Sequence, residues 1–454
     1  MQAPSRPLAL IVLAAGAGTR MNSELPKPLH KLGCAPLLAH SIAAGAVLEP
    51  SRIIVITGNG ADAVEAALAD IAPEAIPIRQ EPQLGTGHGV LQAASALKEF
   101  DGDVMVLYAD SPFFRPETLQ AMRISRDVYD VVMLGFHPAD PGRYGRLVMD
   151  GDSLTRIVEF KDASAEERAI PFCNSGVLCA DAATLMGLLE QVTNDNAAGE
   201  YYLTDIPGLA TKAGLKATAI TCDEAETIGI NSRAELVAAE AQFQARRRGE
   251  MIDNGVTMQA PDSVHLALDT YIGRDAIIEP YVVFGPDVTV ESGAQIRAFS
   301  HLEGCHVSAG AIIGPYARLR PGAEIGNNAR VGNFVEIKQA EIAEGAKVSH
   351  LSYIGDATVG ERANIGAGTV TCNYDGVMKH HTQIGADAFI GSDTMLVAPV
   401  RVGANAMTAT GSIISDDVPD GALAISRAKQ VNKPGLAVKL RARLKAIKAG
   451  KSKG

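Results

Sequence analysis

Hydrophobic positions in the C-terminal half of the chain recur every six residues. Aliphatic or aromatic side chains keep this spacing over residues 272–302, 313–337 and 384–402. A period of six fits neither a helix nor the alternation of an ordinary strand. It is typical of short parallel strands joined by tight corners, with about three hexads in each coil and the repeating side chain pointing inward. The pattern predicts a left-handed parallel β-helix built of hexapeptide repeats, in preference to a sandwich with accidental spacing.

A glycine often follows the repeating residue, as at Gly273, Gly314 and Gly391. Because glycine reaches positive φ without a Cβ clash, we expect these glycines to form the corners of the coil. The repeat slips near residues 305–311 and 373–382, where we expect insertions to leave the coil as loops.

Residues 1–233 instead alternate strand-like and helix-like segments. Strands are predicted at 8–13, 53–57 and 104–107, and helices at 36–48 and 61–69. This order predicts a Rossmann-like α/β domain with a mostly parallel sheet, whose ligands bind at the carboxyl ends of the strands. Residues 234–254 are rich in helix formers and predict a linker helix, so the β-helix domain spans 255–454.

Composition excludes some classes of protein and predicts a cytoplasmic one. The 454 residues carry a net charge of −11, which argues against a role of the whole protein on nucleic acid. The sequence contains no run of about 18 apolar residues, so we expect no membrane span. The first apolar run leads into a glycine loop, so we interpret it as a strand and not a signal peptide. The six cysteines lack zinc spacing, which fits free thiols in a reducing compartment.

The basic tail from residue 436 has Leu440, Leu444 and Ile447 at helical spacing. It predicts an amphipathic helix that caps the open end of the β-helix. Binding to nucleic acid or to a membrane is the alternative.

A glycine-rich loop, LAAGAGTRM, follows the first predicted strand. Gly16 and Gly18 would let the backbone approach a phosphate, and Arg20 adds positive charge. The loop lacks the GK[ST] of a P-loop, and Met21 stands where a dinucleotide fingerprint has its third glycine. Lys27 is either a second phosphate contact or a solvated lysine.

Asp110 ends the third predicted strand in the sequence YADSP. A carboxylate at that edge suits magnesium and the phosphates it carries, although a turn or helix-capping aspartate has the same pattern.

Polar stretches also interrupt the hexads. They include ARLRPG, VEIK, SHLSY and NIGAGTVTCNYDG. His350 is notable because basic and amide residues lie about one coil away. The tandem His380–His381 fits an exposed loop pair better than a metal site.

The order of the N-terminal motifs indicates a family. LAAGAGTRM, LPKPLH, QLGTGH, YADSP, YGR, VEFKD, NSG, GEYYLTD and GINSR resemble the sugar-nucleotide pyrophosphorylases. With the hexads, nearly the whole chain resembles the bifunctional N-acetylglucosamine-1-phosphate uridyltransferases / glucosamine-1-phosphate N-acetyltransferases. The resemblance implies acetylation of glucosamine 1-phosphate by acetyl-CoA, followed by transfer of UMP from UTP. The products would be UDP-N-acetylglucosamine and pyrophosphate, for peptidoglycan and lipid A synthesis.

The resemblance also implies roles for residues of the first domain. Arg20 and Lys27 would act on the UTP phosphates, and Asp110 and Asn231 would bind magnesium. The residues expected to bind UTP or UDP-N-acetylglucosamine are Leu13, Ala14, Ala15, Gly16, Lys27, Gln80, Gly85, Thr86, Tyr108, Ala109, Asp110, Gly145, Glu159, Asn174 and Asn231.

For the second domain the resemblance implies that His350 is the general base of acetyl transfer, in a homotrimer with shared sites. The residues expected to bind glucosamine 1-phosphate are Arg320, Lys338, Tyr353 and Asn364. Those expected to bind acetyl-CoA are Ala367, Asn373, Tyr374, Ser392, Thr410 and Arg427, with Thr410 at a position where the resemblance leads us to expect alanine.

Two alternatives remain open from the sequence. The β-helix of a single-activity pyrophosphorylase would only oligomerise or regulate, and a non-catalytic subunit would use both folds for binding.

Overall fold

The computed structural model describes residues 6–451. The chain divides into two compact units, one of residues 1–249 with 266–268 and one of residues 250–265 with 269–454. Each unit has its own architecture and is described by itself.

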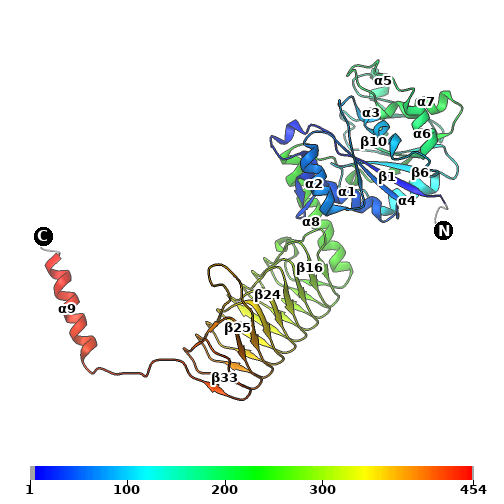
Figure 1. Cartoon of the computed structure of the whole chain (residues 1–454). Helices are drawn as coiled ribbons and strands as arrows, with labels where there is room; N and C mark the ends of the chain where they lie inside the picture. The colour runs from blue at the N-terminus through cyan, green and yellow to red at the C-terminus, as the bar shows by residue number, and fades with distance from the viewer. Residues whose placement is uncertain (1–5, 452–454) are drawn as a thin grey trace. The chain divides into compact units, whose positions relative to one another are not determined.

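The first unit is built on a mostly parallel sheet with the strand order β11-β7-β10-β6-β1-β4-β5 (Figure 1). Only β10 runs antiparallel to its neighbours in this order, and a β8–β9 hairpin extends from it. The strands are β1 (Leu8–Leu13), β4 (Arg52–Thr57), β5 (Ile76–Arg79), β6 (Asp103–Tyr108), β7 (Val131–Phe136), β8 (Arg146–Asp150), β9 (Ser153–Val158), β10 (Cys173–Asp181) and β11 (Ala217–Cys222), with a separate pair β2 (Lys31–Leu32) and β3 (Ala35–Pro36).

Both faces of this sheet are buried. Ala9 and Ile11 of β1 enter one hydrophobic core, and Leu10 and Val12 enter the other. The helices are α1 (Leu37–Ala46), α2 (Ala61–Ile71), α3 (Thr86–Leu91), α4 (Pro116–Ser125), α5 (Ala165–Arg168), α6 (Ala182–Leu189), α7 (Ile206–Lys212) and α8 (Arg233–Asp253). Burial on both faces explains the unbroken hydrophobic runs, and the predicted α/β class is confirmed.

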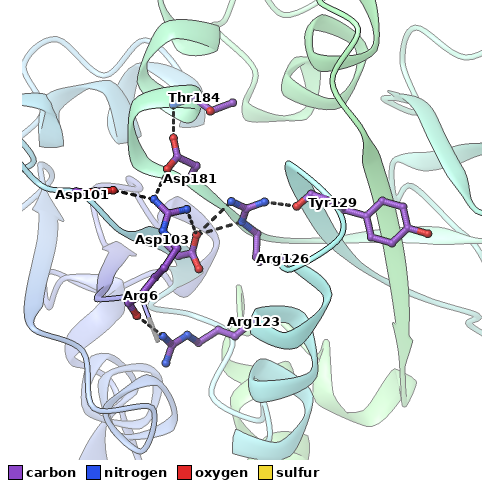
Figure 2. A network of polar contacts seen from close by, with 8 residues as sticks. All are labelled: Arg6, Asp101, Asp103, Arg123, Arg126, Tyr129, Asp181 and Thr184. Carbon is purple, nitrogen blue, oxygen red and sulfur yellow. Dashed lines mark hydrogen bonds and ion pairs between the residues drawn. The ribbon is translucent and has the colours of Figure 1, made fainter. Parts of the chain in front are cut away.

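An ion network joins the amino ends of β1 and β6 to the helices beside them (Figure 2). Arg6 reaches Asp181 at 2.7 Å and Asp101 at 3.0 Å. The buried Asp103 accepts from Arg126 of the α4 C-terminus, with the nearest pair of atoms 3.2 Å apart. This network lies at the edge of the sheet opposite to the carboxyl ends of β1 and β6, and it anchors the strands there.

Helix α8 covers the segment predicted as a linker, but it packs against the first unit for most of its length. Ala239 and Phe243 are buried with Leu32, Leu37 and Phe113 in a small core of their own. The two compact units divide inside the helix, after residue 249.

The second unit is a coil of short parallel strands, stacked one above another in Figure 1. One face contains β12 (Thr257–Met258), β14 (Ile277–Ile278), β17 (Gln295–Ile296), β20 (Ile312–Ile313), β23 (Arg330–Asn333), β25 (Lys347–His350), β27 (Asn364–Ile365), β30 (Phe389–Ile390), β33 (Met407–Thr408) and β35 (Leu423–Ala424). The others contain β13 (Tyr271–Ile272), β15 (Val283–Phe284), β16 (Val288–Val290), β18 (His301–Leu302), β19 (Cys305–Val307), β21 (Arg318–Leu319), β22 (Ala323–Ile325), β24 (Glu336–Ile342), β26 (Tyr353–Val359), β28 (Val370–Cys372), β29 (Thr382–Ile384), β31 (Met395–Val397), β32 (Val400–Val402) and β34 (Ile413–Ile414).

The hexad residues point into this coil as predicted. Phe284, Ile296 and Leu302 are fully buried. Ile278 pairs with Ile296 and Phe284 with Leu302, so each side chain stacks on the one three hexads later. The parallel hexapeptide fold is therefore confirmed.

The reason we gave for the glycines after the repeat is wrong for most of them. Gly273 and Gly391 do not have positive φ, whereas Gly314 does. A Cβ on Gly273 would lie 2.6 Å from the backbone nitrogen of Ser292. Glycine is required there because the next coil approaches closely, and left-handed corners instead use residues such as Asp275 and Asn328.

The two slips of the hexad have different causes. Between Asn373 and Thr382 the chain does leave the coil, in a loop closed by an antiparallel bridge from Tyr374 to Lys379. Near Cys305 the prediction of a loop is wrong. Strand β19 stays in register with β16 and β22, because the repeat is shortened rather than interrupted.

An aromatic ladder runs along one corner of the coil. Tyr281, Phe299, Tyr316 and Phe334 are stacked with ring centroids 5.0, 4.8 and 5.3 Å apart. All four have positive φ, between 55° and 61°. Stacking between successive coils compensates for backbone strain at these corners.

The basic tail forms helix α9 (Leu436–Lys451). Its described side chains are exposed, including the predicted apolar stripe of Leu440, Leu444 and Ile447, so the expected capping contact is not present. Within residues 6–451 no helix combines the length and apolar character that crossing a membrane requires. The cysteines there form no disulfide.

Candidate active sites

A cavity of about 350 Å³ opens at the carboxyl ends of β1 and β6 in the first unit, and we call it the first-unit cavity. Many of the predicted ligand-binding residues line it together. They are Leu13, Ala14, Ala15, Gly16, Lys27, Gln80, Gly85, Thr86, Tyr108, Ala109 and Asp110. The cavity is also lined by three residues for which the sequence predicted no role: Pro28, Gln83 and Glu200.

Strand register explains why these distant segments meet. Leu13 ends β1 and pairs with Tyr108 at the end of β6. Ala109 N donates to the carbonyl of Leu13 at 3.0 Å, which continues this pairing past the strands. The glycine loop and Asp110 therefore emerge side by side.

Two glycines of the loop act differently. A Cβ on Gly18, which has φ +60, would lie 2.7 Å from Cβ of Lys27, so glycine lets the loop approach this lysine. A Cβ on Gly16 would meet no protein atom within 4 Å. Gly16 thus leaves the backbone open toward the cavity, as a phosphate loop requires.

Lys27 bridges the two predicted metal ligands. Its ammonium donates to Asp110 Oδ2 and, at 2.6 Å, to Asn231 Oδ1. The Lys27 side chain is only 11% exposed. One carboxylate oxygen and one amide oxygen therefore converge on a single cation position, and oxygen donors of this kind fit magnesium.

Glu235 holds Asn231 in place and was missed in the sequence. Its carboxylate accepts from the backbone N–H of Asn231 at 2.5 Å and of Ser232 at 3.1 Å, while Ser232 Oγ accepts from Glu235 N at 3.2 Å. This is a capping box at the start of α8, and the spacing Ser-x-x-Glu in NSRAE is its signal.

Three further predicted residues form a group on β8–β10. Asn174 N donates to the carbonyl of Gly145 at 2.9 Å, and a Cβ on Gly145 would lie 3.4 Å from Glu159 Oε1. Thr204 donates to the same Glu159 oxygen at 3.1 Å. Burial raises the pKa of Glu159, and the hydrogen bond from Thr204 opposes that rise.

Tyr108 connects this group to the first-unit cavity. Burial raises the pKa of its phenol, and the charges of Asp110 and Glu159 raise it further, so it stays a neutral hydroxyl. A Cβ on Gly176, which has φ +93, would lie 2.7 Å from the Tyr108 ring. The glycine of NSG therefore makes room for this tyrosine.

Arg146 of the YGR motif is almost completely buried at 2% exposure. Its guanidinium donates to the backbone carbonyls of Tyr144, Gly142 and Arg168. It therefore shapes the loop that carries Gly145. Arg20, by contrast, is exposed in its loop and lies outside the cavity lining.

In the second unit, predicted residues form a cluster on β21, β24, β26 and the loop after β28. Arg320 pairs with Glu336 at 2.8 Å, and Lys379 beside Lys338 lowers the pKa of that lysine. Asn373 Nδ2 lies 3.5 Å from the Tyr353 hydroxyl and also donates to Asp356. The cluster is polar with excess positive charge, which suits a phosphorylated ligand.

A second set of residues follows one corner of the coil and is called the corner column: Asn333, His350, Ala367, Ser392 and Thr410. The carbonyl of each of the first four accepts a backbone hydrogen bond from the next coil. In each case the donor is the residue that directly follows the next member of the column, as when the residue after His350 donates to Asn333. Arg427 donates to the carbonyl of Thr410 at 2.6 Å. Five predicted residues, from His350 to Arg427, are thus brought into one line.

Four residues remain apart from these groups. Asn364 begins β27 opposite Lys347, and Tyr374 is 61% exposed in the loop after β28. His380 contacts Asp375 at 2.7 Å whereas the neighbouring His381 contacts Thr358 at 3.0 Å. The histidines have different partners, which supports the loop interpretation over a metal site.

Comparison with known proteins accounts for both units. Residues 10–170 match the MobA-like NTP transferase domain, and residues 269–304 and 304–339 match the bacterial transferase hexapeptide (six repeats). The chain is 82% identical to the bifunctional protein GlmU of Jannaschia sp. (strain CCS1), covering 100% of both chains. It is 65% identical to that of Ruegeria sp. (strain TM1040), over 98% of this chain and 99% of the relative, and 62% identical to that of Paracoccus denitrificans (strain Pd 1222), over 96% and 97%. The chain therefore belongs to the family of bifunctional GlmU proteins, the uridyltransferase/acetyltransferases that make UDP-N-acetylglucosamine.

Proposed function

We propose that the first-unit cavity is the uridyl-transfer site. A phosphate oxygen of N-acetylglucosamine 1-phosphate attacks the α-phosphorus of UTP. The bond from this phosphorus to the bridging oxygen breaks, and pyrophosphate leaves with the electron pair. Because the nucleophile is already an anion, no general base is needed, and the chain supplies positioning and charge neutralisation.

The arrangement of Lys27 between Asp110 and Asn231 carries this proposal. Lys27, joined by Arg20, would hold the UTP phosphates, and the backbone of residues 13–16 with Gln80, Gly85 and Thr86 would bind uracil and ribose. Asp110 and Asn231 would hold magnesium, which supplies charge neutralisation at the phosphates when bound. Release of Lys27 from these two oxygens would let its ammonium turn to phosphate.

Gly145, Glu159 and Asn174 would bind the sugar of N-acetylglucosamine 1-phosphate. Glu159 is held by Thr204, lies beside Gly145 and is close enough to Tyr108 for its charge to raise the pKa of that phenol. Its carboxylate can accept from sugar hydroxyls, and the backbone of Gly145 approaches the sugar without a side chain in the way.

We propose that acetyl transfer uses the corner column and the Arg320–Lys338–Tyr353–Asn373 cluster. His350 would take the proton as the 2-amine of glucosamine 1-phosphate attacks the thioester carbon, and coenzyme A leaves as the C–S bond breaks. Arg320, Lys338 and Tyr353 would bind the sugar phosphate. Ala367, Ser392, Thr410 and Arg427, which continue the line above His350, would contact acetyl-CoA with Asn373 and Tyr374.

A homotrimer with shared acetyl sites is part of this proposal. Asn364 aligns with Lys347, three residues before His350 in the neighbouring strand. That separation is about 10 Å along the coil face. Asn364 would bind the sugar phosphate at one of these shared sites.

Two variants of the full chain test the assignment of the two sites. Acetyl transfer is followed as free coenzyme A released from glucosamine 1-phosphate and acetyl-CoA. Uridyl transfer is followed in a separate assay as pyrophosphate released from UTP, magnesium and directly supplied N-acetylglucosamine 1-phosphate. His350→Ala should lower coenzyme A release about 10²- to 10⁴-fold and leave pyrophosphate release from N-acetylglucosamine 1-phosphate intact. Asp110→Asn should do the reverse. Wild-type coenzyme A release by His350→Ala would overturn the role of His350.

A further inference from the structure

Asn333 is the side chain that contacts the imidazole of His350. Asn333 Oδ1 lies 2.8 Å from His350 Nδ1. The two residues are register partners in β23 and β25, on successive coils. Leu351 N also donates to the carbonyl of Asn333 at 3.1 Å. Backbone and side chain therefore both define this pair.

The chemistry of the contact determines the protonation of the ring. An amide oxygen only accepts hydrogen bonds, so the Nδ1 that it faces must carry the hydrogen. In a neutral imidazole the other nitrogen, Nε2, then has the free lone pair. Proton abstraction requires such a lone pair on the nitrogen that faces the substrate.

We propose that Asn333 is a positioning residue for acetyl transfer, which holds His350 in the Nδ1–H tautomer and presents Nε2 as the base. This inference rests on the proposed role of His350. Asn333 touches neither the amine nor the thioester and acts through the imidazole alone.

The charge of the acceptor itself explains why an amide suits this position. Arg297 and Arg330 line a cavity of about 230 Å³ together with Asn333 and His350, and Lys347 lies on the same strand as His350. A carboxylate in place of Asn333 would keep an acceptor at Nδ1 but would favour the protonated imidazole, which has no lone pair. An amide orients the ring without adding that charge.

Three variants of the full-length enzyme test this inference. Asn333→Ala removes the acceptor, and Asn333→Asp retains it with a negative charge. Asn327→Asp makes the same charge change on an exposed asparagine that lines a different cavity of the coil. For each variant kcat and KM of acetyl transfer are measured across pH, and chemical denaturation followed by circular dichroism monitors folding of the coil.

We expect Asn333→Ala to lower kcat of acetyl transfer by about tenfold or more, with little change in KM. This loss should be smaller than the loss of activity in His350→Ala. The acid limb of Asn333→Asp should move to higher pH, and above that limb this variant should retain more activity than Asn333→Ala. Asn327→Asp should match the wild type. ¹⁵N NMR of labelled histidine, with the His350 signals identified by their loss in His350→Ala, should show the proton on Nδ1 in the wild type and not in Asn333→Ala.

Different results separate the two claims. If His350→Ala is inactive but Asn333→Ala keeps the wild-type kcat, or the wild-type ring carries its proton on Nε2, the positioning role is overturned. If Asn333→Asp is as poor as Asn333→Ala even above its acid limb, the amide donates instead of accepts and the tautomer is wrong. If His350→Ala itself keeps acetyl transfer, the proposed function fails and this inference fails with it.

Discussion

At the scale of single residues, the first-unit cavity depends on side chains that hold others in place. Asn231 reaches Lys27 only because its own backbone N–H is fixed by Glu235 at the start of α8. Glu235 does not line the first-unit cavity. Its effect should therefore appear in the dependence of the reaction on the cation and not in the sugar subsite.

Glu235→Ala should raise the magnesium concentration that gives half-maximal uridyl transfer, because Asn231 loses its anchor. Loss of the cap should also lower the free energy of unfolding by about 1 kcal/mol. Glu167→Ala is the matched control, because it breaks a second capping box, with Ser164 at the start of α5. The control should share the loss of stability but keep the wild-type magnesium dependence. An equal magnesium shift in both variants would remove the positioning role of Glu235.

Glu159 should give uridyl transfer an acid limb above the range of an ordinary glutamate. Burial raises its pKa from 4.5, so the carboxylate that accepts from the sugar is lost at a higher pH as the solution is acidified. Glu159→Gln should lower kcat/KM for N-acetylglucosamine 1-phosphate by about tenfold or more and abolish this limb. The two pH profiles are compared on the same substrate, so that titration of its phosphate cancels. An unchanged limb in Glu159→Gln would assign it to another group.

The same shift has a consequence for stability. A raised carboxyl pKa means that the folded state favours the neutral form. Stability is therefore lost as pH rises from the unfolded value through the folded pKa. Glu159→Gln should remove that loss, which denaturant unfolding at several pH values measures.

At the scale of elements, the coil combines a buried stack of hexad residues with an exposed aromatic ladder. Phe299 stacks on both Tyr281 and Tyr316. Its φ of +61° is strained for any residue other than glycine. Packing and backbone strain thus oppose each other at one position and can be separated by two substitutions.

Phe299→Ala should lower the free energy of unfolding of the coil by about 1–3 kcal/mol, since two stacked contacts are lost while the strain remains. Phe299→Gly loses the same contacts but relieves the strain, so it should be less destabilised than the alanine variant. Chemical denaturation followed by circular dichroism gives both values. Alanine and glycine variants of equal stability would show that the corner is not strained.

At the scale of the whole molecule, two units with separate cores are expected to respond to different ligands. UTP with magnesium at about 100 times its dissociation constant should stabilise the first unit by about 2.7 kcal/mol. Acetyl-CoA should instead protect peptides of the corner column. Hydrogen exchange measured peptide by peptide detects both effects. Equal protection of the coil by UTP would contradict the assignment of the sites.

The sequence by itself determined the two architectures, and the resemblance of its motifs to a known family named most of the residues that line the first-unit cavity. Hydrophobic periodicity is local, so a six-residue repeat and a strand–helix alternation specify their elements before any tertiary contact forms. The motif residues from Leu13 to Asp110 follow strands, and the carboxyl ends of parallel strands meet at one edge of a sheet. That geometry brings them together in any chain with this order of elements.

Only the tertiary structure decided how individual side chains meet. The contact of Asn333 with His350 depends on the register between coils, and Glu235 reaches Asn231 only once α8 begins at its cap. The glycines after the hexad residue are needed for close approach between coils and mostly not for positive φ. Near Cys305 a slip in the repeat means a shortened coil and not a loop. A one-dimensional pattern records spacing along the chain, whereas these outcomes depend on distances between segments that only folding sets.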